Sequence, residues 1–251
     1  MISPEVFGMS ESPTHRLVNI PKVNSRYLSD YMVASERARR TIIRDCKYRK
    51  IARAIQHDRA KAFITNALRG GSLSTSALEQ EGQRLLDMMA DTEFERDTLD
   101  INGDFLMAYA SVFDMETFPN NAEIVDAPTD FRVNINGVEV NADIRFGTQR
   151  VTRTNRLRTG LGTIRYAKNK PLDEEVGAYQ SSVLYGCRKM IDVQDETAPE
   201  EKLCLTLDCA TGKFIPAPSD ATRRFQNMEA ACATIAERWD NIEPPENAVI
   251  S

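Results

Sequence analysis

A change of hydrophobic period near residue 120 constrains the fold of this chain more than any other feature of its sequence. Up to that point apolar residues recur at helical spacing, as in the stretch 105–113. Beyond it, residues 131–135 and 138–146 alternate apolar and polar side chains, which is the period of a strand. Asn136-Gly137 lies between these two segments and predicts a two-residue hairpin turn. The sequence therefore predicts a chain that is helical first and builds its sheet later.

Further strands and helices follow from the same two periods. Residues 161–166 and 202–208 predict strands, the first of them central, and 213–215 predicts a short return strand. Helices are expected at about residues 35–44, 48–68, 76–89, 104–116, 173–190 and 220–239. Expected N-caps are Ser29 or Asp30 for the first of these helices, Ser76 for the third and Asp220 for the last.

This order predicts an α/β fold, an α+β arrangement in which a mixed sheet is flanked by helices, with a helical N-terminal region. The expected division is an irregular segment over 1–27, a helical region over 28–103, an α/β core over 104–243 and a loose tail over 244–251. A length of 251 residues with 41% apolar residues suits one large domain or a domain with a helical extension.

Composition excludes several classes of protein. There is no apolar run of about 18 residues and no apolar N-terminal stretch of signal-peptide length, so we expect a cytoplasmic protein without membrane contact. The five cysteines form no CxxC pair and there are only two histidines, so neither a zinc site nor a His-rich metal site is expected. Reduced and mostly buried thiols are the expected state of the cysteines.

Positive charge is concentrated in one segment although the net charge is −5. Residues 144–172 contain eight Arg or Lys and no Asp or Glu, and they include a basic loop of about a dozen residues between two predicted strands. The residues expected to bind nucleic acid or another polyanion are Arg150, Arg153, Arg156, Arg158 and Arg165. The alternative is a flexible, solvated loop that docks on an acidic surface.

Four polar residues lie along the predicted hairpin, the strand after it and the next helix. Asp143 lies on the return strand of the hairpin, Lys168 follows the next strand, and Gln180 and Tyr185 share the helix after it. This arrangement, within the order helix, hairpin, strand, helix, hairpin, helix, resembles the restriction-endonuclease-like core of the PD-(D/E)XK nuclease superfamily, especially its RecB-like branch. The resemblance covers about residues 104–240.

The resemblance implies a metal-dependent hydrolase of nucleic-acid phosphodiesters. Asp143 would be one of two acids that hold Mg²⁺ or Mn²⁺, which polarises the phosphate and lowers the pKa of the attacking water. Lys168 would position that water and offset negative charge, and Gln180 would belong to the helix motif. A matching segment, Gly162-Thr-Ile-Arg-Tyr-Ala-Lys-Asn-Lys-Pro-Leu172, is similar to a stretch in a family of uncharacterised bacterial proteins.

The sequence departs from the nuclease pattern at two points. Tyr166 stands where the second acid is expected, two residues before Lys168, and the spacing from Gln180 to Tyr185 is one residue longer than usual. An acid from elsewhere could replace the missing one. The candidates near the junction of helix and hairpin are Glu116, Glu123, Asp126 and Asp130.

Three functions therefore remain open. The first is the active nuclease, and the second is an inactive module of the same fold that binds nucleic acid or a partner protein through its arginine loop. The third is a helical assembly module in which residues 28–116 form a homo-oligomer surface. Topology discriminates among them, because the nuclease hypothesis requires the strand of Lys168 to lie beside the strand of Asp143, with the two side chains converging on a shared metal-water site. Asp143 has a plainer alternative role as an ion-pair partner of Arg145 or Arg165.

Overall fold

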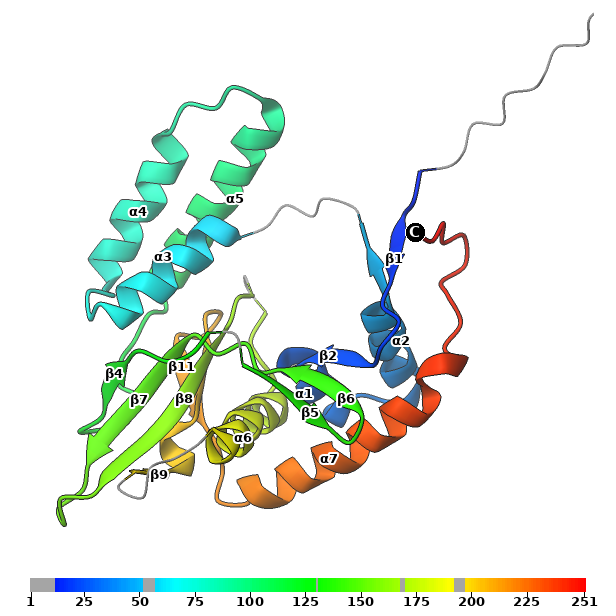
Figure 1. Cartoon of the computed structure of the whole chain (residues 1–251). Coiled ribbons are helices and arrows are strands. Elements are labelled where there is room, and N and C mark those ends of the chain that lie inside the picture. The colour runs from blue at the N-terminus through cyan, green and yellow to red at the C-terminus, as the bar shows by residue number, and fades with distance from the viewer. Residues whose placement is uncertain (1–11, 52–56, 130, 168–169, 192–196) are drawn as a thin grey trace, which may run out of the picture.

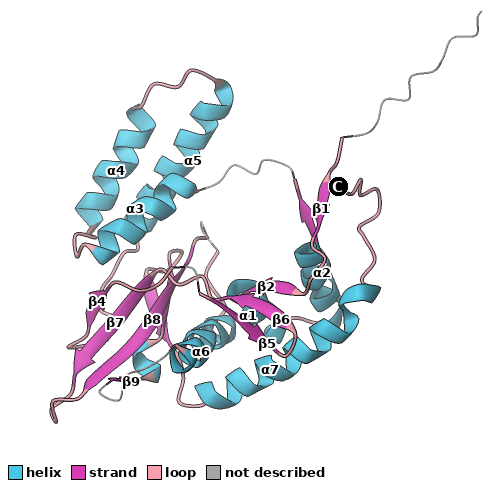
Figure 2. Ribbon diagram, viewed as in Figure 1, coloured by secondary structure: helices cyan, strands magenta, loops and turns pink. Residues whose placement is uncertain are grey.

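The structure is a computed structural model that describes residues 12–51, 57–129, 131–167, 170–191 and 197–251. It has the α/β fold that the sequence predicts, with a mixed sheet flanked by helices (Figure 1, Figure 2). None of the helices in these ranges is both long enough and apolar enough to cross a membrane.

The main sheet has the strand order β11-β10-β8-β7-β4, with β9 pairing to β8. Its strands are β4 (Glu123–Val125), β7 (Phe146–Val151), β8 (Leu157–Arg165), β9 (Thr197–Pro199), β10 (Leu205–Asp208) and β11 (Lys213–Pro216). β8 and β10 are parallel and are joined through α6 (Glu174–Met190), whereas β7 and β11 pair antiparallel to their neighbours. The C-terminal ends of β8 and β10 therefore meet at one edge of the sheet.

A smaller sheet has the order β2-β6-β5, formed by β2 (Lys22–Asn24), β5 (Arg132–Ile135) and β6 (Val138–Asn141). The predicted turn at Asn136-Gly137 is confirmed, because both residues have positive φ and join β5 to β6. The return strand predicted over 138–146 is wrong as one element. β6 ends at Asn141 and β7 begins at Phe146, because Asp143 has a φ of 49° and breaks the extended backbone between them.

The N-terminal segment is more regular than predicted. β1 (His15–Leu17) pairs with β3 (Tyr48–Lys50), and β2 leads into α1 (Ser25–Val33), capped by Asn24. α2 (Glu36–Lys47) begins after Ser35, whose side chain caps it, so Ser29 and Asp30 lie inside α1 and do not cap α2. The helix predicted to begin at residue 48 is wrong at its start, since backbone pairing with β1 holds 48–50 as a strand.

The remaining helices are α3 (Asp58–Arg69), α4 (Thr75–Asp87), α5 (Glu93–Ala110) and α7 (Ala221–Arg238). Ser74 caps α4 in place of Ser76, and α5 begins eleven residues before the predicted start at Asp104, after its cap Thr92. Asp220 precedes α7 as expected, but its carboxylate pairs with Arg223 and Arg224 and makes no side-chain cap hydrogen bond.

Two apolar cores lie on opposite faces of the main sheet. One joins α1, α6, α7 and the small sheet, and the other joins α3, α4 and α5 to the opposite face (Figure 1). Alternation along β8 assigns Leu161 to the first core and Ile164 to the second. Residues 28–103, expected as one helical region, therefore contribute to both cores, because α1 and α2 pack on one side and α3 and α4 on the other.

Candidate functional site

The predicted basic loop is a hairpin whose strands are paired almost to its tip. β7 and β8 pair from Phe146↔Gly162 out to Val151↔Leu157, and only residues 152–156 form the turn. Within the turn the Thr152 amide donates to the Arg156 carbonyl at 2.9 Å, and Thr152 Oγ1 accepts from the Arg156 amide at 3.0 Å. A flexible loop of about a dozen residues is therefore a wrong expectation, because the strands consume most of that length.

The hairpin arginines differ in exposure and in ion pairing. Arg153 and Arg156 are exposed at the turn, and neither forms an ion pair within the described ranges. Arg150 pairs with Glu200, while Arg158 lies half-buried directly opposite Arg150 on β8. Two like charges in one cross-strand pair repel each other, and the carboxylate of Glu200 offsets that repulsion. The tip of the hairpin thus presents two unpaired guanidinium groups.

Arg165 lies at the other end of β8 and is separated from this tip. The strand runs over nine residues, which corresponds to about 26 Å at about 3.3 Å per residue. The guanidinium of Arg165 is buried, where it donates to Asp30 Oδ1 at 2.7 Å and to Gln180 Oε1 at 3.1 Å. Burial lowers the pKa of Arg165, and the hydrogen bond to Asp30 opposes this shift. Arg165 is therefore a buried ion-pair residue and does not share a surface with the other four arginines.

Gln180 reaches the same buried group from α6. Its side chain is 1% exposed, and its Nε2 atom has no hydrogen-bond partner among the described residues. The predicted helix residue is thus placed at the end of β8, as expected, but its amide contacts Arg165 and is sealed from solvent.

Asp143 occupies the turn between β6 and β7. Its carbonyl accepts from Thr163 Oγ1 at 2.8 Å, so the turn lies against the C-terminal half of β8. The strand that leads toward Lys168 therefore lies beside the segment of Asp143, whereas the convergence of the two side chains stays a prediction. The carboxylate of Asp143 pairs with Arg145 at 2.6 Å, which is the plainer role considered for it. Lys168 itself lies outside the described residues.

Tyr166, which stands at the position of the second acid, packs against the helices α3 and α5. Its hydroxyl lies 3.0 Å from Thr65 Oγ1 on α3, and its ring packs against Phe105 of α5. Burial raises the pKa of this hydroxyl. The side chain at 166 thus packs between α3 and α5, with Lys61 Nζ 5.5 Å from the centre of its ring, and this packing occupies the position of the second acid.

No contact with Asp143 is found for the acids considered as replacements, among those that the structure describes. Glu123 accepts from Gln149 on β7 and is exposed, Asp126 and Glu116 are also exposed, and Asp130 lies outside the described residues. Sequence reasoning missed Asp208, a buried acid that ends β10 beside Arg165. A signal for it existed, since the ends of parallel strands meet at one sheet edge.

The carboxylate of Asp208 is occupied by hydrogen bonds that hold the loops around the end of β10. Its carboxylate accepts from the amides of Leu172 and Ala210, each at 3.1 Å, and from Thr211 Oγ1 at 2.8 Å. Across the parts of the chain that the structure describes, no three His, Cys, Asp or Glu side chains gather as a metal site. The described residues therefore do not fit a dication held by two carboxylates at this edge, because Asp143 and Asp208 are both engaged with protein groups.

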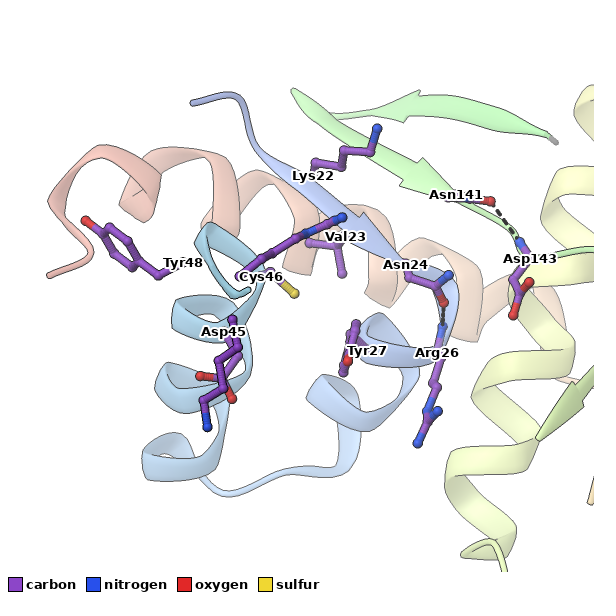
Figure 3. Close-up of a pocket in the computed structure, with 12 residues that line it drawn as sticks. Lys22, Val23, Asn24, Arg26, Tyr27, Asp45, Cys46, Tyr48, Asn141 and Asp143 are labelled. Atoms are coloured by element: carbon purple, nitrogen blue, oxygen red, sulfur yellow. Dashed lines mark hydrogen bonds between the residues drawn. The ribbon is translucent and has the colours of Figure 1, made fainter. Parts of the chain in front are cut away.

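A polar groove of about 590 Å³ opens next to Asp143 (Figure 3). Its walls come from β2 and α1, from the end of α2 with β3, and from the turn after β6. The lining residues are Lys22, Val23, Asn24, Arg26, Tyr27, Asp45, Cys46, Tyr48, Arg49, Lys50, Asn141 and Asp143.

Comparison of the chain with protein-family models found no match, and comparison with curated proteins found none either.

Proposed function

We propose that this chain binds nucleic acid through the β7–β8 hairpin and that its nuclease-like sheet serves as the scaffold. The observation that carries the proposal is the pair of exposed arginines, Arg153 and Arg156, that project without an ion-pair partner within the described ranges. Arginine is well suited to this task, because its planar guanidinium donates two parallel hydrogen bonds to a phosphate.

The rest of the hairpin supports the same proposal. Thr154 and Asn155 are exposed between the two arginines and offer neutral donors to phosphate oxygens. The turn is held by its own hydrogen bonds, and Glu200 binds Arg150 in the second strand pair from the turn. A preorganised cationic tip loses less conformational entropy on binding than a flexible loop would.

Metal-dependent phosphodiester hydrolysis is the second candidate. It is favoured by the position of Asp143 against β8, the strand that leads toward Lys168. It is disfavoured by Tyr166, which fills the position of the second acid, and by the Asp143–Arg145 ion pair. We therefore rank nucleic-acid binding without cleavage above it.

Salt dependence of binding tests the first proposal. The affinity for a labelled DNA duplex is measured against salt concentration for the wild type and for the double variant Arg153→Gln/Arg156→Gln. We expect the variant to lower the slope of log affinity against log salt by about 1.8, because each phosphate contact contributes about 0.9. The double variant Arg37→Gln/Arg59→Gln removes two exposed arginines elsewhere and should leave the slope unchanged.

Cleavage assays separate the two candidates. Single- and double-stranded DNA and RNA are incubated with Mg²⁺ or Mn²⁺, with a chelator control, beside Asp143→Asn and Lys168→Ala. Metal-dependent cleavage that both variants lose would establish the nuclease. No cleavage from folded protein that binds through the hairpin supports the binding module, and unchanged binding by the hairpin variant would overturn it.

A further inference from the structure

We propose that the groove beside Asp143 binds a single-stranded segment of nucleic acid, with a base stacked on Tyr27 and phosphates held by Arg26, Arg49 and Lys50. This inference deepens the proposed function and rests on it, since it names the strandedness of the ligand. It concerns a different surface, because the hairpin tip adjoins the start of β8, whereas the groove is lined by Asp143, whose carbonyl accepts from Thr163 near the other end of that strand.

The groove is built from three separate parts of the chain. β2 and the first turn of α1 form one wall, and the end of α2 with β3 forms another. The turn after β6 closes the third side, where Asn141 Oδ1 accepts from the Asp143 amide (Figure 3). Its volume of about 590 Å³ falls in the range of about 300–1,000 Å³ that is usual for ligand sites.

Charge in the groove favours an anion. Lys22 is paired with Glu139 and Asp143 with Arg145, so these charges are already compensated. Arg26, Arg49 and Lys50 have no ion pair inside the described parts of the chain, and they face one uncompensated acid, Asp45. The balance of free charge is therefore positive, as a phosphodiester backbone requires.

Tyr27 gives the groove its preference for unpaired bases. Its side chain is 46% exposed although it lines the groove, while the neighbouring Tyr48 is buried and donates to the Ile242 carbonyl. Cations that track the backbone and an accessible aromatic ring on which a base stacks are the combination found in proteins that bind single strands. In a duplex the faces of the bases are stacked on one another, so a ring at a groove wall cannot reach them.

The test compares the two surfaces in one assay. Fluorescence anisotropy gives affinities for a labelled single-stranded oligonucleotide, as DNA and as RNA, and for a duplex of the same length. Tyr27→Leu removes the ring, and the matched control Tyr27→Phe keeps it. Arg26→Gln removes one groove charge, and Arg59→Gln, at an exposed position on α3 that does not line the groove, is its control. Circular dichroism verifies that every variant is folded.

We expect Tyr27→Leu to weaken single-strand binding by roughly 5- to 140-fold, the effect of losing one stacked base, and to leave duplex binding unchanged. Tyr27→Phe should bind like the wild type. Equal single-strand affinity of Tyr27→Leu and wild type, or equal losses on single strands and duplex, overturns the groove proposal while the hairpin proposal stands. A wild type that binds no nucleic acid overturns both.

Discussion

The guanidinium of Arg165 and the carboxylate of Asp30 lie 2.7 Å apart, although 135 residues separate them in the chain. The pair fastens α1 to the end of β8, and Gln180 on α6 accepts from the same guanidinium. One buried cation thus joins three elements at the sheet edge where the groove opens. The hairpin arginines of the basic segment, from Arg150 to Arg158, lie at the opposite end of β8.

Removing the charge of Asp30 should destabilise the fold. We expect Asp30→Asn to cost about 1–3 kcal/mol, less than the 3–5 kcal/mol typical of a fully buried pair, because the Asp30 side chain is 30% exposed. Urea unfolding gives the difference. Asp97→Asn removes an exposed acid on α5 and should stay within about 0.5 kcal/mol of wild type. Equal midpoints for both variants would show that the pair contributes no stability.

Gly162 on β8 leaves room for the ring of Phe146. A Cβ atom at this glycine would lie 2.1 Å from two carbons of that ring, which belongs to the opposite strand and is fully buried. We expect Gly162→Ala to destabilise the fold by about 1–3 kcal/mol or more through overpacking. In a double-mutant cycle, Phe146→Leu should recover part of that loss. Purely additive losses would contradict the steric explanation.

Lys47 binds the backbone that directly follows α7. Its buried ammonium donates to the carbonyls of Trp239, Asp240 and Ile242 at 2.7, 3.2 and 3.2 Å. Lys47→Met would leave these carbonyls without the donor, at about 1–3 kcal/mol for each one that stays buried. We expect a total loss of about 2–5 kcal/mol in urea unfolding. The control Lys213→Met, at an exposed position on β11, should change stability little.

Local patterns predicted the elements better than they predicted their partners. The period change, the Asn136-Gly137 turn and the strands around 161–166 and 202–208 are all borne out, because these signals act over a few residues. Strand lengths were harder to predict, since pairing of β7 with β8 extends both strands into the basic segment. No local signal indicates that residues 48–50 pair with β1.

In the candidate site, too, the positions of residues along the chain were easier to predict than their contacts. The order of elements placed Asp143, Gln180 and the end of β8 near one sheet edge, as the structure shows. What each side chain contacts there depends on α1 and α3, which come from distant parts of the sequence. Asp30 on α1 accepts a hydrogen bond from Arg165, and Thr65 on α3 is hydrogen-bonded to the hydroxyl of Tyr166. Such contacts arise only when the helices have packed.

The buried thiols should make the fold sensitive to alkaline pH. All five cysteines are free and buried, as the sequence predicts, and burial raises the pKa of Cys232 from 9.0 to about 12. Between these values the unfolded chain releases a proton that the folded chain keeps, so the stability present below pH 9.0 falls as pH rises toward 12. Cys232→Ala should flatten this decline by up to about 1.4 kcal/mol per pH unit. Urea unfolding from about pH 8 to about pH 11 in reductant measures it, and parallel curves would refute the assignment.

Placing the missing acid at position 166 tests the metal hypothesis directly. A carboxylate there would replace the ring that packs on Phe105 and would lie near the ammonium of Lys61, which offsets part of the desolvation, so we expect Tyr166→Glu to cost about 1–3 kcal/mol near neutral pH. Burial would raise the pKa of that carboxyl above its unfolded value of about 4.3, so the cost should shrink as pH falls toward about 4. The control Tyr166→Phe removes only the hydroxyl and should cost about 1 kcal/mol. Urea unfolding of both variants, with and without excess Mg²⁺, provides the measurement. If Mg²⁺ stabilised Tyr166→Glu but not the double variant Tyr166→Glu/Asp143→Asn, the two positions would be able to share a cation, and Tyr166 would be the residue that prevents it in the wild type; no Mg²⁺ effect on Tyr166→Glu would count against a two-acid metal site at this edge.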